Sequence, residues 1–272
     1  MNAPDADKVF TGAIPKIYET HLVPLIFQPY AVDLVTRLAS RSLSCVLETA
    51  AGTGVVTRQM ARVLPESVSI IATDLNQPML DFAREIEIER PVQWLQADAT
   101  QLPFEDETFD AVACQFGVMF FPDKQKAFSE ARRVLKKGGV LIFNVWDRIE
   151  ENEFPHAVAK ALDAFFPQNP SRFLERTPHG YHDLAVLEQD LKLAGFVAPV
   201  QISTVAASSQ ASSARIPAIA FCQGTPLRNE IEARGLSRLA EVTDFVSQRM
   251  TERFGTGAVD GKIQAHIVSV EC

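Results

Sequence analysis

The stretch VLETAAGTG, residues 46–54, decides the fold: an apolar run is followed by an acidic residue and then by a turn rich in glycine. Gly52 and Gly54 let the backbone bend sharply and let a ligand approach where a Cβ atom would collide. A strand that ends in such a turn is typical of nucleoside sites at the carboxyl edge of a parallel sheet. The stretch therefore predicts a nucleoside-bearing cofactor above that edge.

The glycine spacing argues against a dinucleotide as that cofactor. A dinucleotide fingerprint has a further glycine at position 57, where the helix packs close to the strand and its N-terminus holds a pyrophosphate. This chain has Thr57 there, and Ala50 stands where the turn would carry its first glycine. The turn is better suited to a small ligand whose charges are a carboxylate, an amine and a sulfonium.

Two more segments continue the pattern in order. SIIATD, residues 69–74, is an apolar strand that ends in Asp74, whose carboxylate can accept hydrogen bonds from both ribose hydroxyls. A plain helix cap is the alternative role for this residue. The run VQWLQADATQLPFEDETFDAVACQFGVMFF, residues 92–121, supplies a third strand that ends near Asp98 and a fourth strand, FDAVACQ.

Together with EARRVLKKGGVLIFNVWD, these motifs resemble the class I S-adenosylmethionine-dependent methyltransferases. The resemblance covers residues 45–147 and is to the group that includes ubiquinone and menaquinone methyltransferases, methyltransferase type 11. It implies S-adenosylmethionine as methyl donor and S-adenosylhomocysteine as product. The expected acceptor is a small, fairly apolar organic molecule, and O-, N- and C-methylation all stay open.

The expected fold class is α/β. Strands and helices alternate along the chain, which predicts parallel strands with helices on both faces. The resemblance implies a Rossmann-like, seven-stranded, mostly parallel sheet whose last strand is antiparallel and lies between the fifth and sixth, plus a helical lid. We expect strands at 43–49, 67–73, 91–96, 109–115, 139–146, 196–205 and 262–270, and helices at 54–64, 77–89, 122–136 and 183–194.

We expect one methyltransferase domain over residues 1–272. Its parts are N-terminal helices at 13–42, broken at Pro24 and Pro29, a cofactor-binding core at 43–147, and remaining core at 183–205 and 262–270. The segments 150–180 and 206–255 lie outside the common core and are expected to form the acceptor lid. Within them, the serine-rich stretch AASSQASSA, residues 206–214, has the composition of a linker.

The resemblance also implies the cofactor contacts. Glu48 supports the methionine amine, the turn surrounds the methionine, Asp74 holds the ribose, and an aromatic residue of the N-terminal helix closes the site. The full expected set is Tyr18, Glu48, Ala50, Ala51, Gly52, Gly54, Asp74, Leu75, Met79, Asp98, Ala99 and Gln115. Leu75 and Met79 would pack on the adenine, Asp98 and Ala99 would meet its amine, and Gln115 would face the methionine. Core packing is the alternative for Met79 and Tyr18, and a turn is the alternative for Asp98.

Two histidines are candidates for a catalytic base. His179 and His182 flank Tyr181 in TPHGYHD, within the expected lid, and an imidazole titrates near neutral pH. Ordinary hydrogen bonding is the alternative role for both histidines. Transfer from an activated sulfonium requires no protein nucleophile or metal, and many resembling proteins use no dedicated base. The aromatic residues of the expected lid indicate an apolar acceptor or simply a core: Phe154, Phe165, Phe166, Phe173, Tyr181 and Phe221.

Composition excludes several other classes. The formal net charge of −8 opposes a nucleic-acid partner, and the four cysteines form no C-x-x-C pair, so neither a zinc site nor a redox pair is indicated. The start MNAPDADKVF does not resemble a signal peptide, and no uninterrupted apolar run reaches the roughly 20 residues of a membrane span. We therefore expect a cytoplasmic protein with a small-molecule partner. A nicotinamide-dependent oxidoreductase and a non-catalytic S-adenosylmethionine-binding module are the alternative functions.

Overall fold

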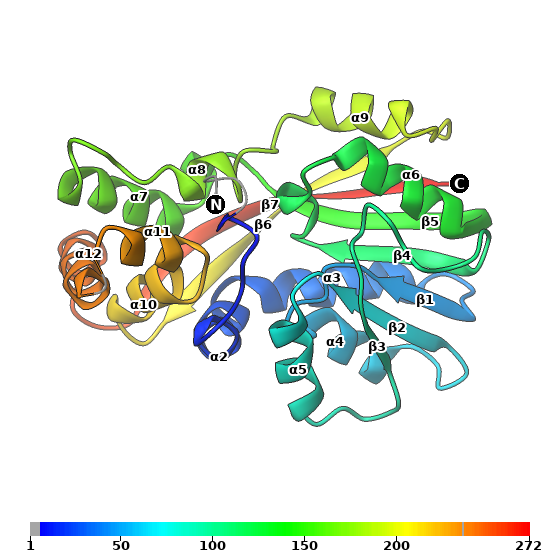
Figure 1. Ribbon diagram of the computed structural model, residues 1–272, viewed down its shortest axis with the longest axis horizontal. Helices are drawn as coiled ribbons and strands as arrows, with labels where there is room; N and C mark the ends of the chain where they lie inside the picture. Colours follow the sequence, from blue (N-terminus) through cyan, green and yellow to red (C-terminus); the bar gives the residue numbers. More distant parts are fainter. Residues whose placement is uncertain (1–5, 236) are drawn as a thin grey trace. The chain divides into compact units, whose positions relative to one another are not determined.

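The computed structural model describes residues 6–235 and 237–272. Within them the chain forms one seven-stranded sheet with the strand order β3-β2-β1-β4-β5-β7-β6 (Figure 1). The first five residues of the polar start lie outside the described part. The strands are β1 Cys45–Glu48, β2 Ser69–Asp74, β3 Gln93–Gln96, β4 Phe109–Gln115, β5 Leu135–Trp146, β6 Gln201–Ala211 and β7 Val259–Glu271.

The first five strands are parallel and the last strand reverses direction. Glu48 of β1 pairs with Ala72 of β2 and with Ala113 of β4, so three strands end near the same level. Strand β7 runs antiparallel to β5, because the Gly138 amide donates to the Cys272 carbonyl whereas the Asp147 amide donates to the Gln264 carbonyl. The predicted seven-stranded, mostly parallel sheet with β7 between β5 and β6 is confirmed.

The chain divides into two compact units, which we describe separately. The sheet unit comprises Pro29–Val145, Tyr181–Val205 and Ala265–Cys272. The helical unit comprises the described residues up to Gln28, Trp146–Gly180 and Ala206–Gln264. Both segments expected to form the lid, 150–180 and 206–255, therefore belong to the helical unit, together with the start of the chain.

The core of the sheet unit lies around β4 and β5. Nearly every side chain of these strands is buried, as expected for central parallel strands with helices on both faces. Helices α6 and α9 lie side by side, and α5 contacts β2 and β3 (Figure 1). The helical segments are α3 Gln28–Ala39, α4 Val55–Val63, α5 Gln77–Glu85, η2 Val118–Phe120, α6 Lys124–Val134 and α9 Leu184–Leu193.

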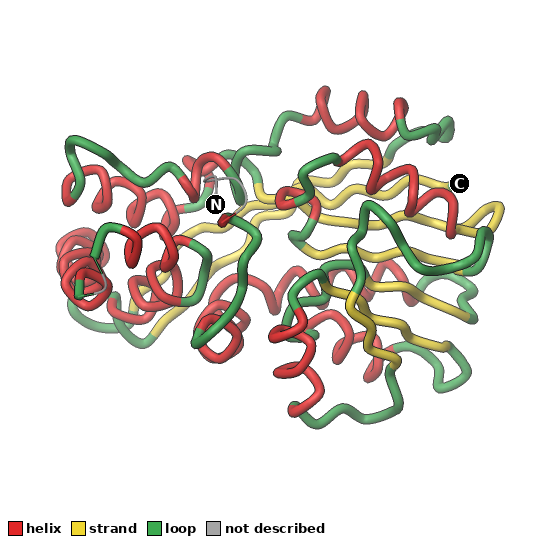
Figure 2. Tube along the Cα trace, viewed as in Figure 1, coloured by secondary structure: helices red, strands yellow, loops and turns green. Residues whose placement is uncertain are grey.

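The helical unit is built around α12. One face of this helix buries Val242, Val246 and Met250, and α12 contacts both α7 and α10 (Figure 2). The ring of Phe154 meets that of Phe254 edge-on, with centroids 5.0 Å apart. The helical segments are α2 Ile14–Ile17, η1 Tyr18–Phe27, η3 Ile149–Glu151, α7 Glu153–Phe165, α8 Phe173–Arg176, α10 Arg215–Gln223, α11 Leu227–Ala233 and α12 Arg238–Phe254.

The expected helix break at Pro24 is wrong. Pro24 lies inside η1, a π-helical stretch that continues directly from α2. The Gln28 amide donates to the carbonyl of Val23, five residues earlier, so the turn here is wider than in an α-helix. A wider turn moves the preceding carbonyls away from the proline ring, and proline has no amide hydrogen that needs a partner. Pro29, the other expected break, is the second residue of α3 and does not end the helix either.

The whole helix Ile14–Ala39 is long and apolar enough to cross a membrane by length and composition alone. More than half of its most apolar window, 56%, is buried inside the protein. Polar and charged residues interrupt every apolar run in this helix before it reaches that length. They are few, however, so the mean hydropathy of the helix stays high.

The prediction of a serine-rich linker at 206–214 is wrong for most of that segment. Strand β6 continues to Ala211, because a strand needs backbone partners and tolerates small polar side chains. Ser209 is fully buried and its hydroxyl donates to the Leu25 carbonyl at 2.7 Å. The expected lid segment 206–255 therefore begins with strand residues. At its other end β6 begins at Gln201, two residues after Pro199, which has no amide to give to a sheet.

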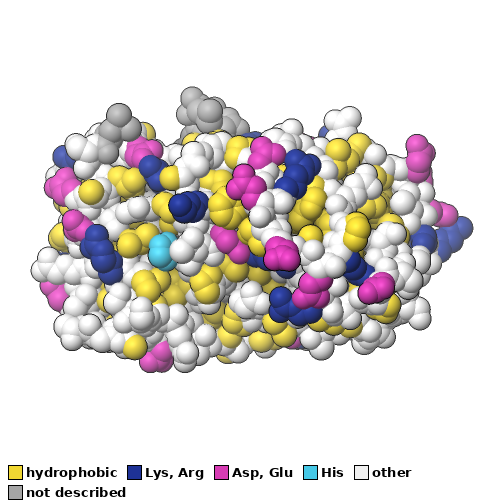
Figure 3. All heavy atoms as spheres, turned by 90° about the horizontal axis from the view of Figure 1, so that it is seen from below, with side chains coloured by type: hydrophobic (Ala, Val, Ile, Leu, Met, Phe, Trp, Pro, Cys, Tyr) yellow, Lys and Arg dark blue, Asp and Glu magenta, His cyan; other side chains and the backbone are white. Residues whose placement is uncertain are grey.

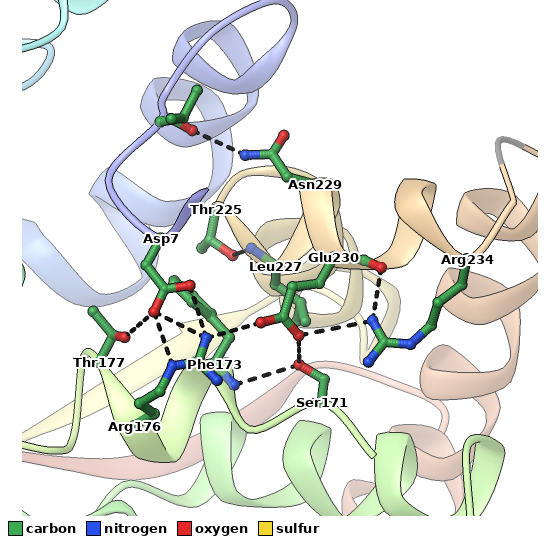
Figure 4. Close-up of polar contacts among 11 residues, drawn as sticks. Asp7, Ser171, Phe173, Arg176, Thr177, Thr225, Leu227, Asn229, Glu230 and Arg234 are labelled. Atoms are coloured by element: carbon green, nitrogen blue, oxygen red, sulfur yellow. Dashed lines mark hydrogen bonds and ion pairs between the residues drawn. The ribbon is translucent and has the colours of Figure 1, made fainter. Parts of the chain in front are cut away.

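A polar cluster fastens the start of the chain within the helical unit (Figure 4). The buried Asp7 carboxylate accepts from the guanidinium of Arg176 at 2.7 Å and from the Thr177 hydroxyl. Arg176 also donates to Glu230 of α11 at 2.8 Å, and Asn229 donates to the Val9 carbonyl at 3.1 Å. Because the carboxylate is buried and paired, this cluster holds residues 7–9 against α8 and α11.

The surface mixes both signs of charge. Figure 3 shows one face on which Lys and Arg side chains lie among Asp and Glu side chains, with apolar atoms between them. Exposed ion pairs such as Arg62–Glu89 at 3.3 Å and Arg84–Asp81 at 3.2 Å are of the kind that add little to stability.

Candidate functional site

The glycine turn joins β1 to α4. Gly52 and Gly54 adopt left-handed backbone angles, with φ of 57° and 84°, and Gly54 is the residue before the first turn of α4. A Cβ atom on Gly54 would lie 2.6 Å from the ring of Trp94 in β3. Both the backbone angle and the lack of space therefore require glycine at this position. The turn was predicted from the sequence but Trp94 was not, because the contact joins the turn to a strand residue 40 positions further along the chain.

Ala50 and the segment after β4 press against each other. Ala50 has a φ of 53°, an uncommon value for a residue with a side chain. A Cβ atom on Gly117 would collide with the Cβ of Ala50 and lie 2.8 Å from Sγ of Cys114. Gly117 therefore lets the loop after β4 approach the turn after β1 as closely as it does.

Asp74 connects the turn after β1 with the turn after β2. Its Oδ2 accepts from the Gly52 amide at 2.8 Å, and its Oδ1 accepts from the Asn76 amide at 2.7 Å. Burial raises the pKa of Asp74, and the hydrogen bonds from Asn76 and Gly52 act in the opposite direction. The alternative role as a helix cap does not apply to Asp74, because Asn76 holds the N-cap position of α5 and makes no side-chain capping bond.

Glu48, the last residue of β1, is a second buried carboxyl group near the turn. Its Oε2 accepts a hydrogen bond from the Thr57 hydroxyl on α4. Burial raises the pKa of Glu48 to about 8, although the bond from Thr57 and the charge of Arg58 lower it. Glu48 therefore holds a proton near neutral pH when no cation is beside it. This contact was not predicted from the sequence, where Thr57 stood out only as the residue in place of a glycine.

The residues expected around the adenine have different environments. Leu75 is 43% exposed, whereas Met79 is buried in the core, which agrees with the alternative given for it. Asp98 Oδ1 accepts from the Thr100 amide at 2.8 Å and from its hydroxyl at 2.7 Å, so this carboxylate shapes its own turn. Ala99 lies between them and is partly exposed.

At the end of β4, Gln115 is held by its neighbour on β5. The Asn144 amide group contacts Gln115 Oε1 at 3.4 Å, and Asn144 Oδ1 accepts from the Phe116 amide at 2.8 Å. Asn144 is fully buried and so fixes both the side chain of Gln115 and the left-handed Phe116 that follows it. Asn144 was not among the predicted site residues, although a polar residue inside the apolar run VLIFNVW is a visible signal.

The two candidate bases fall in different units. His179 is buried in the helical unit, and its Nδ1 lies 2.8 Å from the Asp147 carbonyl oxygen. Because a carbonyl only accepts, Nδ1 carries the hydrogen, and Nε2 is the accepting nitrogen of the neutral ring. His182 is half-buried in the sheet unit, next to Asp183, which caps α9 by accepting from the Ala185 amide at 2.9 Å.

Tyr181 is also accounted for within the sheet unit. Its hydroxyl donates to Asp190 at 2.8 Å, and the ammonium of Lys124 lies 4.8 Å from the ring centroid. Burial and then the Asp190 carboxylate raise the pKa of Tyr181 well above its usual range. Most of the aromatic side chains named for the expected lid are buried, which favours the core alternative: Phe154, Phe166, Phe173, Tyr181 and Phe221.

Tyr18 belongs to a row of rings in the helical unit. It stacks on Phe27 with centroids 4.9 Å apart and meets Phe10 edge-on at 6.1 Å. Phe27 neighbours Trp146 at 6.2 Å, and Trp146 neighbours His179 at 6.1 Å. We call these five residues the aromatic row.

Among the described residues, no group of three His, Cys, Asp or Glu side chains is placed to hold a metal ion.

Known proteins resemble this chain most clearly over its first strands and the helices between them. A family model described as a methyltransferase domain matches residues 47–143. The ubiquinone/menaquinone biosynthesis C-methyltransferase UbiE of Cronobacter sakazakii is 42% identical over 101 residues, which are 36% of this chain and 40% of that protein. The chain thus spans less than half the length of the curated relatives that it matches.

Solved structures extend the likeness to most of the chain. A candidate methyltransferase from Bacillus halodurans superposes with a TM-score of 0.56 at 20% identity, covering 88% of this chain and 97% of that one. Phosphoethanolamine N-methyltransferase 2 of Haemonchus contortus, solved with phosphomonomethylethanolamine and S-adenosylhomocysteine, superposes with a TM-score of 0.58 at 17% identity, covering 94% and 56%. At these identities the likeness shows the fold. The resemblance of the sequence to class I S-adenosylmethionine-dependent methyltransferases is confirmed.

Proposed function

We propose that this chain, whose residues 47–143 carry a methyltransferase domain, transfers a methyl group from S-adenosylmethionine to a small, fairly apolar organic acceptor. One observation carries the proposal. Two buried carboxyl groups, Glu48 and Asp74, end adjacent parallel strands on either side of one glycine turn. Such a pair suits a ligand with a cationic amine at one end and ribose hydroxyls further along.

We assign the donor contacts accordingly. Glu48 binds the methionine amine, and Asp74 binds the ribose hydroxyls. An ionised carboxylate has about four acceptor sites, so Asp74 can accept from the ribose in addition to the Gly52 and Asn76 amides. The exposed Leu75 covers the adenine, and Gln115, fixed by Asn144, faces the methionine. The remaining assignments stay as the sequence predicted them: Tyr18, Ala50, Ala51, Gly52, Gly54, Met79, Asp98 and Ala99.

Methyl transfer from a sulfonium is an in-line displacement that depends mainly on alignment and on keeping water out. The protein needs neither a metal nor a nucleophile for it. An acceptor oxygen or nitrogen loses a proton in the process, and of the two candidate bases we assign this role to His179. Its Nδ1 contact with the Asp147 carbonyl presets the tautomer in which Nε2 accepts a proton.

We assign acceptor binding to the helical unit. The aromatic row supplies stacking and apolar surface for a small ligand. The matched relative is named for C-methylation in ubiquinone and menaquinone biosynthesis, so an aromatic quinone precursor is the first acceptor to try. A cytoplasmic location and a small-molecule partner remain part of the proposal.

A turnover assay tests the proposal. The full chain is incubated with S-adenosylmethionine carrying a deuterated methyl group and with a panel of aromatic acceptors, and products are followed by mass spectrometry. The proposal expects S-adenosylhomocysteine and an equal amount of labelled acceptor. Binding of S-adenosylmethionine without turnover on any acceptor would favour the non-catalytic module instead.

A further inference from the structure

The contact between Thr57 and Glu48 crosses from α4 to the end of β1. Both side chains are almost completely buried, and the Thr57 hydroxyl donates to one oxygen of the carboxyl group. Thr57 stands at the position where a dinucleotide fingerprint has its last glycine, which there lets the helix pack closely on the strand. In this chain the same position holds a side chain that bonds the first acidic residue of the motif.

We propose that Thr57 is the positioning residue for Glu48, and that Glu48 releases its proton to solvent when the amine of the methyl donor binds. The inference rests on the proposed function. The carboxyl O–H bond breaks, its electron pair stays on the carboxylate, and the proton leaves to the buffer. The Thr57 hydroxyl then holds the new carboxylate in place for the ammonium group.

The surroundings of Glu48 support proton release on binding. The charged or titratable groups that act on it are Arg58 on α4, Asp74 on β2 and Cys114 on β4. Arg58 favours the ionised form but also donates to the Thr53 carbonyl at 2.5 Å, whereas Asp74 opposes ionisation. Burial outweighs both and raises the pKa of Glu48 to about 8. A bound ammonium adds the compensating positive charge that a buried carboxylate requires.

The chain offers matched variants for a test. Thr57→Val removes the hydroxyl and keeps the shape of the side chain, and Thr57→Ser restores the hydroxyl. Thr73→Val is the control: Thr73 is equally buried, and its hydroxyl donates at 3.0 Å to the backbone carbonyl of Glu48 rather than to the carboxyl group. A merely structural role for Thr57 would make the two valine variants alike.

The measurement is calorimetric binding of S-adenosylhomocysteine, which carries the same amine and is not consumed. Titrations in buffers of different ionisation enthalpy, from about pH 6.5 to about pH 9, give the number of protons released and span the ordinary pKa of an α-amine. The ligand amine titrates identically with every variant, so the ratio of affinities between variants reports Glu48 alone.

We expect wild type, Thr57→Ser and Thr73→Val to release close to one proton per ligand at the acid end. Thr57→Val should bind about 10-fold more weakly or worse there, since a hydrogen bond to a charged group is lost, and the deficit should shrink toward alkaline pH. Glu48→Gln should release no proton. If Thr57→Val does not fold, Thr57→Ala carries the same expectation.

Two results would overturn the inference. In one, wild type binds the ligand without releasing a proton. In the other, Thr57→Val matches Thr73→Val in affinity and in proton release at every pH. A wild-type chain that binds neither S-adenosylmethionine nor S-adenosylhomocysteine would instead contradict the proposed function, and this inference would fall with it.

Discussion

Asp74 Oδ2 accepts a hydrogen bond from the Gly52 amide at 2.8 Å, so the carboxylate that ends β2 directly holds the glycine turn that follows β1. Gly52 and Asp74 are 22 residues apart in the sequence, yet this one side chain fixes the relative geometry of the two turns. A residue proposed to bind ribose therefore also shapes the site into which the ribose goes.

Replacing Asp74 should consequently affect both binding and stability. Asp74→Ala removes two charge-assisted bonds to ribose, each worth roughly 1.5–3 kcal/mol, so affinity for S-adenosylhomocysteine should fall on the order of a hundredfold. The melting temperature of the unliganded chain should also fall, because the Gly52 and Asn76 amides lose their partner. Asp74→Asn, which keeps an acceptor oxygen, should lie between. Calorimetry that finds the affinity of Asp74→Ala within about threefold of wild type would rule out the ribose role.

The buried Glu48 should make the unliganded protein less stable as pH rises. Its folded pKa of about 8 is above the ordinary value of 4.5, so the folded state binds more protons than the unfolded state between those values. The free energy of unfolding therefore contains a contribution that is complete below about pH 4.5 and is lost as pH rises toward about 8.

Glu48→Gln isolates that contribution, because the amide does not titrate. The variant should be more stable than wild type at pH 8 and should approach it at acid pH, while binding the cofactor more weakly. Chemical denaturation of both proteins across this range gives the comparison. Parallel stability curves would show that Glu48 titrates normally.

Gly117 should tolerate no side chain. In Gly117→Ala the new Cβ would collide with Ala50 and crowd Cys114, which should cost about 1–3 kcal/mol of unfolding free energy as an overpacked contact. It should also disturb the glycine turn and weaken cofactor binding. Gly257→Ala is the matched control, since a Cβ there meets nothing within 4 Å and should change neither property. Equal melting temperatures for the two variants would contradict the packing described here.

His179 should affect turnover rather than donor binding. If its Nε2 removes the acceptor proton, His179→Gln should lower kcat by about 10²-fold or more on an oxygen or nitrogen acceptor and leave the affinity for S-adenosylmethionine unchanged. His182→Gln, which changes a half-buried histidine of the other unit, should leave kcat near that of wild type. The reverse order of the two kcat values would move the base to His182.

The sequence was most informative where local pattern and structure coincide. Strand β4 was predicted with its observed bounds, Phe109–Gln115, because an apolar run of strand length is enclosed by polar turns. The place of the last strand, antiparallel and between the fifth and sixth, followed from the family resemblance. In contrast, Ser209 lies in a strand that composition assigned to a linker, because strand pairing satisfies the backbone whatever the side chains are.

The parts of the site that were missed depend on contacts between distant segments. Trp94 of β3 meets Gly54 of the turn after β1, and Asn144 of β5 meets Gln115 of β4; no periodicity in the sequence predicts such pairs. Thr57 could have been found, since a hydroxyl on the buried face of the helix beside an acidic strand end is a recognisable signal. The predicted break at Pro24 is wrong because a π-helical turn accommodates a proline that would interrupt an α-helix.

Side-by-side calorimetric titration of the full chain with S-adenosylmethionine, S-adenosylhomocysteine and a nicotinamide dinucleotide tests the central claim most directly. The account predicts that the donor and its product each bind at one site per chain and that the dinucleotide gives no binding heat, because Thr57 fills the position where a pyrophosphate site needs glycine. Tight binding of the dinucleotide, with none of the methyl donor, would contradict it.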